Sequence, residues 1–191
     1  RFWIILFKTI LSKLYHWKIY VVGSVEYQYP NHLFQAGYFL DKKYYDENTI
    51  DFKHLLLSEK NQSLLKDIQN SNSVGVHIRR GDYMTKQNLV IFGNICTQKY
   101  YHDAIRIITE KVNDAVFYVF SDDISWVQTH LDIPNAVYVN WNTGESSIYD
   151  MYLMSSCKYN IIANSTFSYW AARLNKKTNM VIYPSKWYNT F

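Results

Sequence analysis

The chain has 191 residues, of which 48% are apolar and 19% are charged, enough for one packed domain or for one domain and part of a second. Its formal net charge of +4 is modest and it has no long lysine or arginine cluster, which argues against a nucleic-acid-binding protein. Cys96 and Cys157 are far apart in sequence, which excludes a disulfide scaffold and a paired-cysteine zinc site and fits a reducing compartment.

The first 73 residues have an irregular pattern. Lys8 and Lys13 interrupt the opening apolar segment well short of the roughly 20 residues that a membrane-spanning helix needs. We expect this segment to be a helix that packs on a core or rests at a surface, and we expect the chain to be a fragment. Ser58 can cap the last predicted helix. The apolar spacing predicts helices at Phe2–Trp17, Asp46–Leu57 and Ser58–Gln69, and strands at Ile19–Val25 and Phe34–Phe39.

From residue 74 onward, strands and helices are predicted to alternate. Thr97 can cap the first of these helices, and Ser147 with Asp150 approximates a capping box for the third. Strands that are nearly continuous apolar runs, separated by helices, indicate a Rossmann-like α/β domain whose parallel sheet is covered on both faces. The predicted strands are Val74–Arg79, Ala115–Ser121, Ala136–Val139, Tyr159–Ala163 and Met180–Tyr183, and the predicted helices are Gln98–Val112, Ile124–Leu131, Ser147–Met154 and Ser168–Leu174.

Two arginines follow the first strand of this domain. The loop at the carboxyl end of a parallel strand is where open α/β sheets bind ligands, and the forked guanidinium of Arg79 or Arg80 matches the geometry of a phosphate. Gly81 permits a tight turn or a close approach to a ligand, and Asp82 can orient one guanidinium. The alternative is a strand end with a solvated Arg–Asp pair. His77, at the buried end of the strand, is either a core histidine or a contact to ribose or base.

Polar residues also follow two further strands. Asp122 and Asp123 come after the second strand, and helix capping is the default for such residues. We assign capping to Asp123 and ligand contact to Asp122, and rank a metal site lower because the arginines already supply positive charge. After the fourth strand, Ser165, Thr166 and Ser168 open a helix, where they can cap it or bind an anion. Together these strand ends predict a site for a nucleotide diphosphate.

The chain resembles glycosyltransferase family 11, the α-1,2-fucosyltransferases, and especially its bacterial members. The resemblance covers about Ala36 to Tyr188, and the order of its motifs is more specific than the H-x-R-R-x-D signature alone. The motifs are Gly37-Tyr38-Phe39, Lys43-Tyr44-Tyr45, His77-Ile78-Arg79-Arg80-Gly81-Asp82-Tyr83, Phe120-Ser121-Asp122-Asp123, Asp150-Met151-Tyr152-Leu153-Met154-Ser155, Ile161 through Ser168, Pro184 and Trp187.

The resemblance implies a GT-B-like fold of two Rossmann-type lobes. Residues 74–191 would be the donor lobe, and residues 1–73 an incomplete amino-terminal lobe with connecting helices. It also implies metal-independent, inverting transfer of L-fucose from GDP-β-L-fucose to the 2-hydroxyl of a galactose-containing glycan, with no cofactor. Arg79 would be the catalytic group that stabilises the departing GDP. The donor-binding residues would be His77, Arg79, Arg80, Asp82, Asp122, Ser165, Thr166 and Ser168.

Two departures from the family pattern stand out. The glycine-rich G-G-L-G-N-Q-x-F segment with which members usually begin is missing, so we expect the full-length parent to be the enzyme. Tyr169 and Ala171 replace residues that are commonly Trp and Gly. The alternatives are transfer of a different nucleotide-activated sugar and a GDP-binding module without catalysis. We expect a cytoplasmic protein, and we leave open its contact with the inner face of a membrane and its oligomeric state.

Overall fold

The computed structural model describes residues 20–22, 34–36 and 51–189, and the chain divides into two compact units, residues 1–51 and 52–191. In the first unit, strands β1 (Tyr20–Val22) and β2 (Phe34–Ala36) pair in parallel. Both lie within predicted strands. The predicted helix at Phe2–Trp17 lies outside the described residues, and the predicted lobe boundary after residue 73 stays a prediction.

The second unit is built on a five-stranded parallel sheet with the strand order β5-β4-β3-β6-β7. All five predicted strands of this domain are therefore confirmed, with small differences at their ends. The strands that follow β3 in the chain, β4 and β5, extend the sheet on one side of β3. The later strands β6 and β7 extend it on the other side. The strands are β3 (Asn72–Ile78), β4 (Ala115–Ser121), β5 (Ala136–Val139), β6 (Tyr159–Ile161) and β7 (Met180–Ile182).

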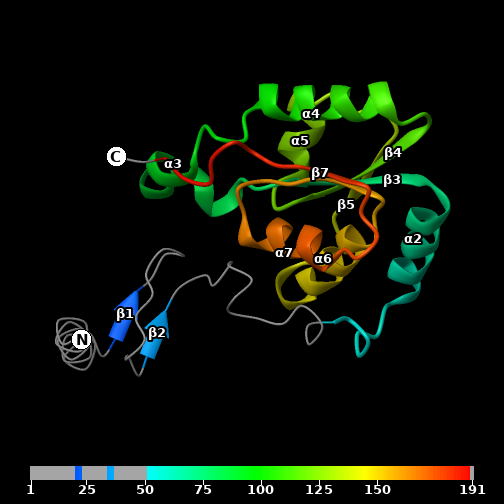
Figure 1. Ribbon diagram of the computed structural model, residues 1–191, viewed down its shortest axis with the longest axis horizontal. Helices are drawn as coiled ribbons and strands as arrows, with labels where there is room; N and C mark the ends of the chain where they lie inside the picture. Colours follow the sequence, from blue (N-terminus) through cyan, green and yellow to red (C-terminus); the bar gives the residue numbers. More distant parts are fainter. Residues whose placement is uncertain (1–19, 23–33, 37–50, 190–191) are drawn as a thin grey trace. The chain divides into compact units, whose positions relative to one another are not determined.

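Helices cover both faces of the sheet, as predicted (Figure 1). On one face lie α4 (Gln98–Lys111) and α5 (Ile124–His130), and on the other lie α2 (Glu59–Asn70), α6 (Ser147–Ser155) and α7 (Thr166–Leu174). Each helix buries an apolar stripe, which is what stabilises a helix laid on a sheet. Fully buried core residues include Val74, Val76, Ile108, Phe117 and Val119 on the first face and Ile68, Phe120, Leu153, Met154 and Ala171 on the second.

Alternation along β3 decides what each face of its carboxyl end carries. Val74, Val76 and Ile78 pack into the core beneath α4 and α5. Gly75 and His77 point to the opposite face, because successive side chains of a strand alternate. A Cβ at Gly75 would lie 2.7 Å from Asn160 Oδ1 of β6 and 3.0 Å from Met154 Cγ of α6, so glycine lets both side chains lie close to β3. Because of the same alternation, His77 lies on the face of the sheet that α7 covers.

Three predictions about helices need correction. Residues 51–57 form no helix, so in its described part the predicted helix Asp46–Leu57 is wrong; the segment has only a turn, and Leu56 is 86% exposed and offers no buried stripe. Helix α7 begins two residues earlier than predicted, at Thr166. The capping box is also wrong, because the 3-10 helix η3 (Gly144–Ser146) runs directly into α6 and leaves Ser147 inside the helix.

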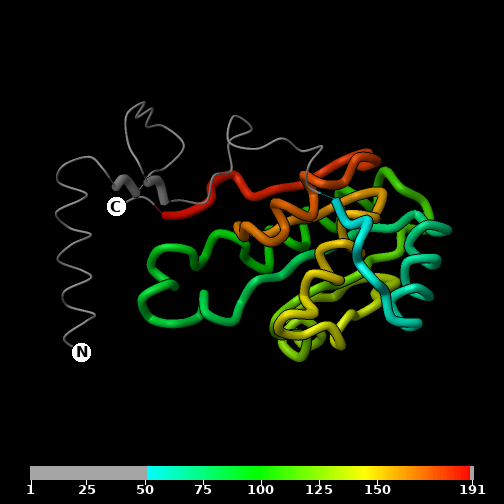
Figure 2. Tube along the Cα trace, turned by 90° about the horizontal axis from the view of Figure 1, so that it is seen from below, coloured from blue at the N-terminus to red at the C-terminus, as the bar shows by residue number. Residues whose placement is uncertain are grey.

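The segment after β3 contains two short helices that the sequence analysis did not identify. These are the 3-10 helix η2 (Gly81–Met84) and α3 (Lys86–Phe92). Thr85 accepts a hydrogen bond from the Asn88 amide and so caps α3, while Gly93 ends it. Figure 2 shows this segment projecting from the unit at the end opposite to α2.

Candidate functional site

The sheet has a switch point between β3 and β6. The chain runs from β3 to β4 and β5 on one side, and β6 and β7 lie on the other side. Open α/β sheets bind ligands in the crevice that such a reversal leaves at the carboxyl ends of the strands. The loop with Arg79 follows β3, and the turn with Ser165 and Thr166 follows β6. The two candidate phosphate-binding segments therefore lie at the same edge of the sheet, one on each side of the switch point.

Two contacts join these segments. The Tyr83 hydroxyl donates a 2.9 Å hydrogen bond to the carbonyl oxygen of Asn164. The rings of His77 and Phe167 lie 5.1 Å apart between centroids. The η2 segment and the start of α7 are thus held together.

Arg79 is held by two carboxylates. Its Nη2 lies 2.6 Å from Asp82 Oδ1 and its Nη1 lies 2.9 Å from Asp122 Oδ2. The Arg79 side chain is nevertheless 35% exposed, so it is not closed off from solvent. A Cβ at Gly81 would lie 2.5 Å from Asp122 Oδ2, so glycine makes room for this carboxylate. The prediction that Asp82 orients an arginine is met by Arg79.

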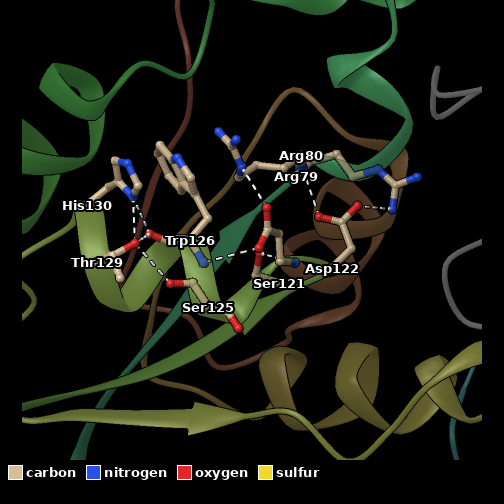
Figure 3. A network of polar contacts seen from close by, with 9 residues as sticks. Arg79, Arg80, Ser121, Asp122, Ser125, Trp126, Thr129 and His130 are labelled. Carbon is tan, nitrogen blue, oxygen red and sulfur yellow. Dashed lines mark hydrogen bonds and ion pairs between the residues drawn. The ribbon is translucent and has the colours of Figure 1, made fainter.

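Arg80 points elsewhere. Its Nε lies 3.1 Å from Asp123 Oδ2, and its guanidinium lies 3.7 Å from the centroid of the Trp126 ring. Figure 3 shows the guanidinium groups of Arg79 and Arg80 directed to opposite sides. The structure therefore does not bring the two groups together as a pair facing one ligand.

The two aspartates after β4 have different roles. Asp123 accepts a 3.1 Å hydrogen bond from the Trp126 amide and caps α5, so the capping prediction is confirmed. Asp122 Oδ1 accepts a 2.8 Å hydrogen bond from the Arg80 amide, and Asp122 Oδ2 faces Arg79. Both oxygens of Asp122 are thus engaged by the loop after β3.

The hydroxyls that precede and open α7 are not equivalent. Ser168 is fully buried and donates to the carbonyl oxygens of Ala163 and Ser165 at 3.2 and 3.3 Å, so its hydroxyl serves the turn itself. Ser165 is the N-cap residue but makes no side-chain capping bond, and Thr166 is half-buried. Thr166 is therefore the most accessible of the three, and Ser165, although only 6% exposed, has a hydroxyl that is not used to cap the helix.

His77 is buried beside this turn. Burial, and then the nearby Arg79 charge, lower the pKa of His77 from 6.5 to about 3, so its imidazole is neutral at physiological pH. Its Nδ1 has no hydrogen-bond partner among the described residues. A buried polar atom without a partner costs free energy, which distinguishes His77 from an ordinary satisfied core histidine.

Asp150 is a partly buried acidic residue outside the predicted set of site residues. It lies in the first turn of α6, and its Oδ1 accepts a 2.7 Å hydrogen bond from Asn142 Nδ2. Asn142 and Trp141 both donate to Asn61 Oδ1, at 3.1 and 2.7 Å, which forms a polar cluster beyond the carboxyl end of β5. Burial raises the pKa of Asp150 to about 7. Its position in the family motif Asp150-Met151-Tyr152 could have drawn attention to it, but Asp150 was interpreted as part of a capping box.

In residues 20–22, 34–36 and 51–189, no group of three or more His, Cys, Asp or Glu side chains is arranged to hold a metal ion. None of the helices in these same ranges has the length and apolar character needed to cross a bilayer.

Comparison with known proteins gives a consistent family. The family model described as glycosyl transferase family 11 matches residues 6–191. An alpha-1,2-colitosyltransferase from Escherichia coli is 35% identical over 87% of this chain and 57% of its own length. The O-antigen biosynthesis glycosyltransferase WbnK from the same species is 44% identical over 63% of this chain and 40% of its own. Galactoside alpha-(1,2)-fucosyltransferase 2 from Pongo pygmaeus is 29% identical over 63% of this chain and 37% of its own.

The chain thus spans about half the length of the first two relatives. Among solved structures, NodZ alpha-1,6-fucosyltransferase, soaked with GDP-fucose, matches with a TM-score of 0.45 at 18% identity, over 69% of this chain and 48% of that one. POFUT1 in complex with GDP-fucose matches with a TM-score of 0.41 at 13% identity, over 67% and 46% of the two chains.

Proposed function

The chain belongs to glycosyl transferase family 11, and on this premise we propose that it forms the donor-binding part of an inverting galactoside α-1,2-fucosyltransferase. The donor is GDP-β-L-fucose, and the acceptor is a galactose-containing glycan. In the GT-B-like arrangement that the family resemblance implies, residues 74–191 supply the nucleotide-sugar lobe. The observation that carries the proposal is the position of Arg79 at the switch point, where Asp82 and Asp122 hold its guanidinium and where Tyr83 of the same segment bonds to the turn before α7.

The diphosphate of the donor binds between Arg79 and the start of α7. Free amide groups at a helix N-terminus attract anions, and Ser165 and Thr166 add hydroxyl donors there. Arg79 carries its positive charge at every physiological pH. Because these groups already supply positive charge and hydrogen-bond donors, the proposal requires no metal ion.

The nucleoside end of the donor needs acceptors for its N–H groups. The family resemblance implies that His77 and Asp122 make this contact. Since both oxygens of Asp122 face Arg79 and the Arg80 amide, we propose that Asp150, on the same edge of the sheet, takes the place of Asp122 as the acceptor for the base. A base that donates two N–H groups to the Asp150 carboxylate would favour its ionised form.

The reaction is a direct displacement with inversion. The 2-hydroxyl oxygen of the acceptor forms a bond to the anomeric carbon of fucose, the bond from that carbon to the diphosphate oxygen breaks, and the hydroxyl proton leaves to a base. Negative charge grows on the departing diphosphate in the transition state. Preorganised donors aimed at developing charge are usually worth about 10²–10³ in rate, and we assign this role to the Arg79 guanidinium.

Substitution of Arg79 by lysine tests this assignment. Lysine keeps the charge but loses the planar fork that both Asp82 and Asp122 engage, so we expect at least about a 100-fold loss of fucose transfer. The measurement is release of GDP from GDP-fucose in the presence of a β-galactoside. The matched control is Arg106→Lys on the exposed face of α4, which should transfer normally. Near-normal turnover of Arg79→Lys would contradict the leaving-group role.

A second candidate is transfer of a different sugar. It is favoured by the 35% identity to a protein named alpha-1,2-colitosyltransferase. Competition between GDP-fucose and nucleotide-activated colitose separates the two, because the correct donor has the higher kcat/KM. GDP binding with transfer of neither sugar would instead indicate a non-catalytic module, and a folded chain that does not bind GDP would contradict all three functions.

A further inference from the structure

We propose that Arg80 is a positioning residue for Arg79, locked in place by Asp123 and Trp126, and that it does not bind the diphosphate itself. The inference deepens the proposed function and rests on it. It assigns a role to the Asp123–Trp126 pair, which we call the Arg80 clamp.

The clamp holds the Arg80 guanidinium by one edge and one face. Asp123 Oδ2 lies 3.1 Å from Arg80 Nε, and the Trp126 ring lies 3.7 Å from the guanidinium carbon. Trp is the best of the aromatic partners for a cation stacked on its face. The Arg80 side chain is 20% exposed, compared with 35% for Arg79. Arg80 is therefore the more enclosed of the two arginines.

Asp123 joins the clamp to the start of α5. Its Oδ1 accepts a 3.1 Å hydrogen bond from the Trp126 amide while its Oδ2 faces Arg80. One carboxylate thus fixes both the helix that carries the indole and the guanidinium that packs on it. The Asp123 amide in turn donates a 3.0 Å hydrogen bond to Ser121 Oγ, which ties the clamp to the end of β4.

A second ring supports the indole. The His130 ring stacks on Trp126 with centroids 4.6 Å apart and planes 12° apart. His130 Nδ1 lies 2.9 Å from the Trp126 carbonyl oxygen and 2.7 Å from Thr129 Oγ1. Figure 3 shows the His130 ring beside the indole, at the end of the network remote from Arg79. The indole therefore has a fixed orientation on α5.

The backbone amide of Arg80 connects the Arg80 clamp to Arg79 through Asp122. The Arg80 amide donates a 2.8 Å hydrogen bond to Asp122 Oδ1, and Asp122 Oδ2 lies 2.9 Å from Arg79 Nη1. Anchoring the Arg80 side chain fixes its amide, the amide fixes Asp122, and Asp122 fixes the guanidinium of Arg79. Catalytic groups need this kind of support, because small errors of position cost much of the rate.

The test uses Trp126→Leu, Arg80→Lys and the double variant. Trp126→Leu removes the stacking face, and Arg80→Lys keeps charge and backbone amide but loses the planar group and Nε. Each should weaken GDP binding about fivefold to tenfold, the range expected for a partly desolvated cation–π contact. Both changes act by loosening the Arg80 backbone amide that bonds to Asp122. The double variant should therefore bind GDP about as weakly as either single variant. Arg106→Lys is the control that should bind GDP normally.

Guanosine provides a readout that a merely structural role would leave unchanged. The clamp acts through Arg79 on the diphosphate, so the variants should lose affinity for GDP while guanosine affinity and the circular dichroism spectrum stay as in the unmodified chain. Calorimetry with both ligands measures this. Trp126→Phe, which keeps an aromatic face, should recover part of the lost GDP affinity.

Three results would overturn the inference. In the first, Arg80→Lys loses GDP affinity while Trp126→Leu keeps it, as a direct phosphate ligand would require. In the second, the losses multiply in the double variant, which means that the residues act independently. In the third, the variants lower the melting temperature but leave GDP affinity intact. Failure of the unmodified chain to bind GDP is a separate outcome, and it counts against the proposed function.

Discussion

The hydroxyl of Tyr83 donates a 2.9 Å hydrogen bond to the carbonyl oxygen of Asn164, across the switch point between β3 and β6. Tyr83 belongs to the η2 segment after Arg79, and Asn164 precedes the start of α7. The Tyr83 ring also stacks on Phe92 of α3, with centroids 4.9 Å apart and planes 18° apart. One side chain thus links the two segments that border the proposed diphosphate site.

Tyr83→Phe should therefore loosen this site and keep the fold. The loss of a single partly buried hydrogen bond should lower the free energy of unfolding by about 1 kcal/mol, measured by urea denaturation. GDP affinity should fall as well, because Arg79 and the start of α7 are no longer held at a fixed separation. Tyr183→Phe, at a 68% exposed position, is the control that should change neither quantity. Unchanged GDP binding by Tyr83→Phe would mean that the bond serves stability alone.

His77 should make the protein less stable in acid. Its pKa is lowered from 6.5 to about 3 by burial and by Arg79, so between these values the unfolded chain takes up a proton that the folded chain excludes. Its contribution to stability is complete above pH 6.5 and is lost as the pH falls towards 3. His77→Phe removes the titrating group, so the free energy of unfolding should fall less steeply below pH 6.5. An identical pH profile for the variant would show that His77 is accessible to protons in the folded state.

Asp150 should make the protein less stable as the pH rises, over a pH range that overlaps that of His77. Burial raises its pKa from 3.8 to about 7, so the folded chain binds the proton more tightly than the unfolded chain does. Its contribution to stability is present below pH 3.8 and is lost as the pH rises towards 7. Asp150→Asn keeps an acceptor for Asn142 Nδ2 and removes the buried charge. The variant should be more stable than the unmodified protein at pH 8, and equal stability there would contradict the raised pKa.

The same substitution separates stability from ligand recognition. If the Asp150 carboxylate accepts hydrogen bonds from the base, Asp150→Asn should weaken GDP binding while it stabilises the fold. Opposite changes in the two quantities are hard to obtain from a general disturbance of α6. Calorimetry at pH 8, where the carboxyl of the unmodified protein is ionised, gives the largest expected difference. Equal GDP affinities would remove Asp150 from the nucleoside site.

The second unit was largely predictable because its signals are local. Strand β4 reads as a continuous apolar run, and Thr97 and Asp123 cap the helices that they precede. The order of the motifs was sufficient to indicate the family. The short helices η2 and α3 were missed because Lys86–Phe92 has no buried residue and so carries no helical stripe of core positions. The cap and stop signals at Thr85 and Gly93 were present but weak without that stripe.

The roles of individual polar residues were less predictable. Asp150 looked like half of a capping box, and only the fold brings Asn142 against it. Ser168 looked like a phosphate contact, but in the structure its hydroxyl is turned to the Ala163 and Ser165 carbonyl oxygens. Hydroxyls and carboxylates form similar bonds with backbone and ligand, so residue type alone does not distinguish these uses.

The sequence by itself determined the parallel sheet, its helical cover and the edge at which Arg79, Asp122 and Ser165 gather, because alternation and apolar runs act over a few neighbouring residues. Only the tertiary structure decided which acid faces which arginine. The register that places Ile78 beside Ser121 brings the loops after β3 and β4 together. Each guanidinium then pairs with the carboxylate toward which it points, Arg79 with Asp122 and Arg80 with Asp123. Arg80 and Asp123 are 43 residues apart in the chain. Without that register, charge attraction alone would not decide which of the two aspartates an arginine contacts.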